Sequence, residues 1–120
     1  MIQSLKPNEL FVFGSNLAGS HGAGAAAQAR KDFGAEWGVG EGITGQSYAF
    51  PTLDENLENR TYEELTFSVK KLYAECNDNP DKKFLMTPVG IGIAGYSVEY
   101  MKSLFTNPPE NLIMPEEFKK

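Results

Sequence analysis

The distribution of glycine is the feature that most constrains this chain. All twelve glycines fall in two segments, nine between residues 14 and 45 and three between residues 90 and 95. Glycine loses more backbone entropy on folding than any other residue, so such clusters indicate backbone that turns sharply or lies close to something. The clusters at 14–24 and 90–95 each follow an apolar run and precede a stretch that favours a helix. For residues 34–45, tight turns explain the glycines as well as a ligand does.

Apolar and aromatic runs predict four strands. Residues 9–13 (ELFVF) and 84–89 (FLMTPV) are the clearest, and 46–50 (QSYAF) is a shorter strand that we expect Pro51 to close. Residues 111–114 (NLIM) predict a last short strand before the charged end of the sequence.

Three helices are predicted between these strands. The first is alanine-rich and covers about 23–33, and the last covers about 97–105. The clearest covers 61–77, where Thr61 and Glu64 have the spacing of a capping box. Strands that alternate with helices indicate an α/β domain with a mainly parallel sheet and helices over its faces. With 120 residues, a single domain over 1–120 is expected.

The two glycine clusters therefore fall where α/β proteins bind ligands. In an open sheet, ligands lie beyond the carboxyl ends of the strands. Backbone N–H groups at the start of a helix bind phosphate without any cation, and the missing glycine Cβ lets the phosphate approach. Two such loops together predict a clamp for the two phosphates of a nucleotide diphosphate.

Familiar nucleotide signatures fit poorly. Gly14 and Gly19 have the spacing of a Walker A loop, but Ser20 and His21 stand where lysine and a hydroxyl residue are required. The order of glycines at 19–24 is the reverse of the dinucleotide fingerprint. Kinase, ATPase and classical dinucleotide-binding interpretations are therefore disfavoured.

Composition excludes several other classes. A net charge of −5 without a basic cluster makes bulk nucleic-acid binding unexpected. The single cysteine, Cys76, permits no internal disulfide, and no metal-ligand spacing is visible. No signal peptide or membrane-spanning run is recognised, so we expect a cytoplasmic protein without a membrane partner, a metal or a cofactor.

At these motifs the chain resembles macrodomains, the ADP-ribose-binding superfamily. The segment at 11–34 (FVFGSNLAGSHGAGAAAQARKDFG) is similar to the first macrodomain ligand loop and helix, and 85–97 (LMTPVGIGIAGYS) is similar to the second loop. The branch of terminal ADP-ribose glycohydrolases has a related helix entry. Small macro-like proteins of bacteria and phages share a stretch like GITGQSYA at 42–49. The resemblance implies a macrodomain-like three-layer α/β/α fold with a mixed, mainly parallel sheet, and an ADP-ribose-like nucleotide as ligand.

The resemblance also implies a set of binding residues. They lie in the turn after the first strand, at the helix entry, beside Gly45 and in the second loop: Gly14, Ser15, Asn16, Gly22, Ala23, Gly24, Gln46, Ser47, Gly90, Ile91, Gly92, Ile93, Ala94, Gly95 and Tyr96. A turn role for Asn16 and a core role for Tyr96 are the competing interpretations.

Catalysis is less well supported than binding. The lysine and aspartate of the glycohydrolase branch are missing, and Ala94 stands at the position of the acid. Asn16 and His21 are the remaining catalytic candidates, because an asparagine can orient water and a histidine can act as a base near neutral pH. Hydrolysis of ADP-ribose from a protein, a nucleic acid or a metabolite is therefore the alternative. A non-catalytic structural or phage interaction protein is the second alternative.

Overall fold

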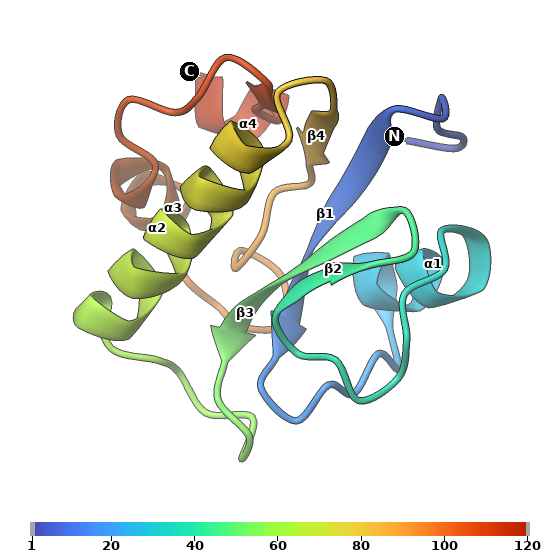
Figure 1. Ribbon diagram of the computed structural model, residues 1–120. Helices are drawn as coiled ribbons and strands as arrows, with labels where there is room; N and C mark the ends of the chain where they lie inside the picture. Colours follow the sequence, from blue (N-terminus) through green and yellow to red (C-terminus); the bar gives the residue numbers. More distant parts are fainter. Residues whose placement is uncertain (1, 120) are drawn as a thin grey trace.

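A five-stranded, mainly parallel sheet forms the centre of the computed structural model, which describes residues 2–119. Its order is β2-β3-β1-β4-β5. The strands are β1 (Glu9–Asn16), β2 (Gly42–Thr44), β3 (Ser47–Leu53), β4 (Lys83–Met86) and β5 (Leu112–Ile113). β1 pairs in parallel with β3 and β4, and β4 with β5, whereas β2 runs antiparallel to β3. The carboxyl ends of β1 and β3 therefore meet at one edge, the lower one in the view (Figure 1).

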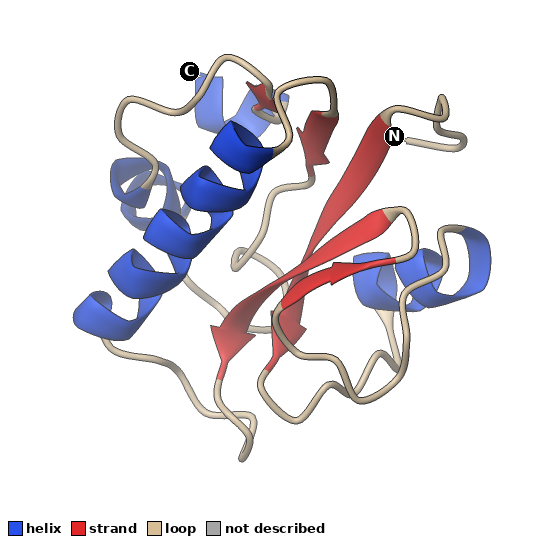
Figure 2. Cartoon of the chain, in the orientation of Figure 1, coloured by secondary structure: helices blue, strands red, loops and turns tan. Residues whose placement is uncertain are grey.

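Helices cover both faces of this sheet. The helices are α1 (Gly24–Asp32), α2 (Tyr62–Asp78), α3 (Val98–Leu104) and α4 (Glu116–Lys119). α1 lies on one face, and the other three lie on the opposite face (Figure 2). The expected α/β domain with a mixed, mainly parallel sheet is confirmed.

Alternation along β1 explains why both faces are covered. Phe11 and Phe13 are buried in a core cluster with the alanines of α1, and Leu10 and Val12 are buried in the larger cluster with α2 and α3. Successive side chains of a strand point to opposite faces, so a strand that is apolar at every position needs helices on both sides.

The helix starts differ in how they are capped. Thr61 and Glu64 form the predicted capping box of α2, with Thr61 Oγ1 accepting from the N–H of Glu64 at 3.2 Å. Ser97 caps α3 by accepting from the N–H of Tyr100. α1 instead begins after Ala23, without a side-chain cap.

The prediction that Pro51 closes its strand is wrong, because β3 continues to Leu53. β2 pairs with β3 only as far as Ala49, so at Pro51 one side of β3 has no neighbouring strand. A proline there removes no ladder hydrogen bond, which is why strands tolerate it at an edge. β4 ends at Met86, three residues before the predicted end.

Within residues 2–119, the helices are too short or too polar for any of them to cross a bilayer.

Candidate functional site

One cavity of about 540 Å³ lies where the two glycine-rich loops meet. Its walls come from the carboxyl ends of β1 and β3, the entry of α1, and the loop after β4. Ten predicted binding residues line it: Gly14, Ser15, Asn16, Gly22, Ala23, Gly24, Gly90, Gly92, Ile93 and Ala94. Segments more than 60 residues apart in the sequence thus form a single hollow, because the strands that precede them are parallel neighbours.

Asn16 shapes the first wall of the cavity. Its Nδ2 donates to the carbonyl of Ser20 at 3.0 Å, and its Oδ1 accepts from the N–H of Ser20 at 3.1 Å. The side chain therefore closes the turn that leads from β1 toward α1, as expected of a turn asparagine. Its hydrogen bonds to the loop backbone are made before any ligand arrives.

The uncapped entry of α1 forms part of the cavity wall. Gly22, Ala23 and Gly24 line the hollow, and Ala23 offers no side-chain cap. The first N–H groups of a helix have no partner inside the helix, and they carry the positive end of its dipole. An anion in the cavity would accept from these groups and take the place of the missing cap.

The second loop forms the opposite wall of the cavity and contains donors that its own turns do not use. Its own turns use the N–H of Tyr96, which donates to Gly90 O at 2.9 Å, and the N–H of Gly95, which donates to Gly92 O at 3.0 Å. Gly90 and Gly95 have φ values of +83° and +79°, which glycine adopts readily. The N–H groups of residues 90–94 donate to no acceptor within residues 2–119.

No charged side chain lines this cavity among the described residues. The polar groups are the hydroxyls of serine and threonine, the amide of Asn16 and the backbone, and the remaining walls are alkyl groups. The absence of carboxylates removes a source of repulsion for an anion in a chain of net charge −5. It also leaves the cavity without a side chain that titrates near neutral pH.

His21 lies outside this hollow. Its ring is 1% exposed and packs edge-on against Phe13, with ring centroids 5.2 Å apart, and near Trp37 at 6.0 Å. Nε2 is 3.1 Å from the carbonyl oxygen of Val39, and Nδ1 is buried without a hydrogen-bond partner. Burial lowers the pKa of His21 below 6.5. This geometry describes a core histidine rather than a base that faces a ligand.

Gln46 and Ser47 lie at the amino end of β3, away from the cavity. Gln46 Nε2 donates to the carbonyls of Lys6 and Glu9 at 3.0 and 3.1 Å, and Ser47 Oγ donates to Thr44 O at 2.7 Å. Both side chains therefore hold neighbouring backbone. Parallel strands put their amino ends at the edge opposite the ligand edge, so neither residue is brought to the site.

Three predicted binding residues of the second loop are not at the hollow. Ile91, Gly95 and Tyr96 are not among the residues that line it. The Tyr96 hydroxyl accepts from the N–H of Arg60 at 2.8 Å and donates to the carbonyl of Thr52 at 3.0 Å, while its ring stacks on Tyr100. Tyr96 thus anchors the loop to the end of β3.

The glycines at 34–45 serve close backbone packing or turns rather than the cavity. Only Gly38 and Gly42 have room for a Cβ, and their φ values are +98° and +105°. A Cβ on Gly40 would lie 2.4 Å from Asn16 O, and one on Gly45 would lie 2.6 Å from Gly34 O. A Cβ on Gly19 would likewise lie 2.3 Å from the carbonyl carbon of Gly38. Of the two interpretations of this segment, the structure supports tight turns.

Several lining residues were missed by the sequence interpretation. They come from the end of β3, the connection to α2 and the start of the second loop, and include Thr52, Leu53, Leu57, Thr87 and Pro88. Leu57 is 58% exposed and has a φ of +63°, which is unusual for leucine. Thr52 and Leu53 were missed because the strand was predicted to end at Pro51, whereas β3 continues to Leu53.

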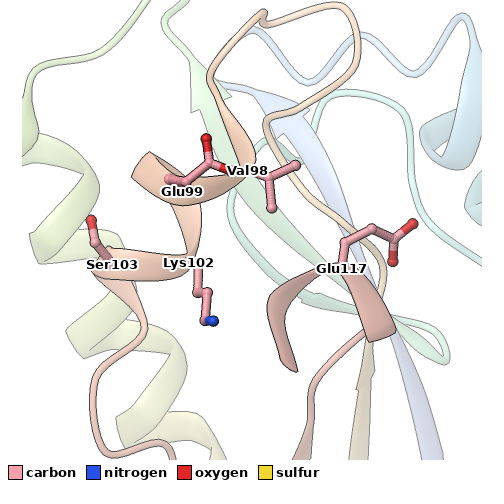
Figure 3. Close-up of a pocket in the computed structure, with 5 residues that line it drawn as sticks. All are labelled: Val98, Glu99, Lys102, Ser103 and Glu117. Atoms are coloured by element: carbon pink, nitrogen blue, oxygen red, sulfur yellow. The ribbon is translucent and has the colours of Figure 1, made fainter. Parts of the chain in front are cut away.

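A second hollow of about 640 Å³ lies between α3 and α4. Figure 3 shows that Glu99, Lys102 and Glu117, which line it, point in different directions and do not converge on one point. None of the predicted site residues lies there.

Neither a protein-family model, nor a curated protein, nor a solved structure matches this chain. Support for a function therefore comes from the geometry of the cavity and from the motif resemblance.

Proposed function

We propose that this protein binds a nucleotide diphosphate of the ADP-ribose class in the cavity between its two glycine-rich loops, on a macrodomain-like three-layer α/β/α fold. One observation carries the proposal: two glycine clusters that are far apart in the sequence line the same hollow. Each cluster by itself is compatible with simple turns. Their convergence at the carboxyl ends of β1 and β4 is what a diphosphate clamp requires.

The distribution of donors supports an anionic ligand. The uncapped start of α1 lines the hollow on one side, and Gly90, Gly92, Ile93 and Ala94, whose N–H groups have no acceptor within residues 2–119, line it on the other. Backbone amides bind phosphate without a lysine or arginine in contact. The lack of cationic side chains at the cavity is therefore compatible with this ligand class.

Size and apolar surface support a nucleotide rather than a bare phosphate. A hollow of about 540 Å³ falls within the range of small-molecule sites. Leu57 and Ile93 both line it and are 58% and 85% exposed. Large exposed alkyl groups at a binding cavity offer a surface on which a base or sugar can be buried.

The test is a thermal-shift and calorimetric titration with ADP-ribose, ADP, AMP, NAD and adenosine. A ligand at one hundred times its Kd stabilises the folded state by about 2.7 kcal/mol, or roughly 10 °C in Tm for a domain of this size. We expect ADP-ribose to give the largest shift. If none of these compounds shifts Tm, the protein does not have the proposed function and the structural alternative gains support.

The lining residues favour binding over hydrolysis. Asn16 is committed to the turn, and the cavity contains no histidine, lysine or carboxylate within residues 2–119. We therefore expect no release of ADP-ribose from an ADP-ribosylated protein. Release by the wild type that is lost in Asn16→Ala, with the fold retained by circular dichroism, would instead establish the hydrolase alternative.

A further inference from the structure

Arg60 is a buried cation that forms no ion pair with a carboxylate of residues 2–119. Arg60 is 9% exposed. The ion pairs found within residues 2–119 join Lys71 to Glu41 and Lys119 to Glu116. Nη1 donates to the carbonyl of Pro51 at 2.7 Å and to Ser68 Oγ at 2.8 Å, while Nε is buried without a partner. Arginine stays protonated in proteins, so a full positive charge is held here.

This charge lies directly behind the cavity wall. The carbonyl that Nη1 contacts belongs to Pro51, and the next residue, Thr52, lines the hollow. The N–H of Arg60 and the carbonyl of Thr52 share the Tyr96 hydroxyl, and Asn59 Nδ2 donates to Ala94 O at 2.9 Å. These bonds connect the Arg60 side chain, through the backbone of β3 and the second loop, to residues that line the cavity.

A buried charge without an ion-pair partner is costly, and it usually persists where something compensates it. Here the adjacent hollow has no charge of its own and presents backbone donors. An anion bound there would be attracted by Arg60 through poorly screened protein rather than through water.

We propose that Arg60 supplies the positive potential that selects an anionic ligand in this cavity, without touching the ligand. The inference rests on the proposed function and deepens it, because it adds ligand charge to the contacts with base and sugar as a determinant of affinity. For two unit charges about 10 Å apart at an effective dielectric constant of about 20, the interaction corresponds to roughly tenfold in affinity. Phosphorylated ligands should therefore bind far better than the uncharged nucleoside.

Ser68 provides a matched pair of variants for the test. Its hydroxyl is buried beside Nη1, so Ser68→Asp places a carboxylate against the guanidinium, and Ser68→Asn places a neutral group of the same size there. We expect Ser68→Asp to bind ADP-ribose at least tenfold more weakly than Ser68→Asn, because the new ion pair cancels the potential. Adenosine, which carries no charge, should bind both variants equally.

A second pair keeps the inference testable if Ser68→Asp does not fold. Arg60→Lys retains the charge and Arg60→Gln removes it, so only Arg60→Gln should lose affinity for ADP-ribose about tenfold. Urea unfolding of each variant separates affinity from stability. Equal ADP-ribose affinities within either folded pair would overturn the electrostatic role and leave Arg60 as a purely structural link. If wild-type protein binds no phosphorylated ligand, the proposed function fails, and this inference fails with it.

Discussion

Gly92 offers the sharpest test of whether a ligand approaches the second loop. A Cβ built on Gly92 meets no atom within 4 Å, and its backbone is outside the positive-φ region. Alanine at this position therefore fits the free protein without strain. The new methyl group would stand beside the cavity that Gly92 lines.

The expected effects on stability and on affinity have opposite signs. Replacing glycine by alanine at a compatible position stabilises a protein by about 0.4–1 kcal/mol, because the unfolded chain loses freedom. A ligand phosphate that contacts the backbone would meet the added methyl group. We expect Gly92→Ala to lower the affinity for ADP-ribose by about tenfold to a hundredfold, which is about 1.4–2.7 kcal/mol of binding free energy.

Two further variants control the experiment. Gly90→Ala lies in the same loop, but its Cβ would be 2.8 Å from Met101 Sδ and its φ is +83°, so it should lower the free energy of unfolding. Ser103→Thr adds one methyl group at the hollow between α3 and α4, away from the glycine-rich loops. It should change neither the free energy of unfolding nor the affinity for ADP-ribose.

Calorimetric titration with ADP-ribose and urea unfolding measure the two quantities for each variant. A Gly92→Ala protein that is as stable as wild type and binds ADP-ribose equally tightly would refute the reasoning, since the ligand would then not approach this part of the loop.

Three other predictions concern stability. The lowered pKa of His21 means that the unfolded state binds a proton more readily, so the free energy of unfolding should fall as pH drops below about 6.5. If a His21→Gln variant shows the same fall between pH 7.5 and 5.5, the pH dependence belongs to other groups. Leu57 has a φ of +63° and is largely exposed, so Leu57→Asn should raise the free energy of unfolding by about 1 kcal/mol, and a loss in urea unfolding would mean that its packing outweighs its strain. Thr61→Ala removes the cap of α2 and should cost about 1 kcal/mol in Tm-based measurements, whereas no change would show that the cap is redundant.

Local patterns were sufficient for most of the elements. The capping box at Thr61 and Glu64 located the start of α2, and the alanine-rich stretch located α1. These features depend on neighbours within one helical turn, which a sequence displays directly. The continuation of β3 past Pro51 was missed because it depends on where β2 stops, which is a property of the partner strand.

The sequence predicted the candidate site only where the direction of a strand was sufficient to place a residue at one edge of the sheet. Gln46 and Ser47 were assigned to the ligand from a motif, although a parallel sheet already places the start of β3 at the far edge. His21 lies next to Gly22 in the sequence, yet one is in the core and the other lines the cavity. Which way a loop residue points is decided by the packing of Phe13 and Trp37 around it.

The glycine clusters also separate what the sequence determines from what the tertiary structure determines. By itself, the sequence determined that two glycine-rich loops follow apolar strands, and therefore that both lie at one edge of a parallel sheet. It did not distinguish Gly19, whose missing Cβ admits the backbone of Gly38, from Gly22, which faces open space. Only the tertiary structure decided which role each glycine has, because that role depends on which atoms lie where a Cβ would stand.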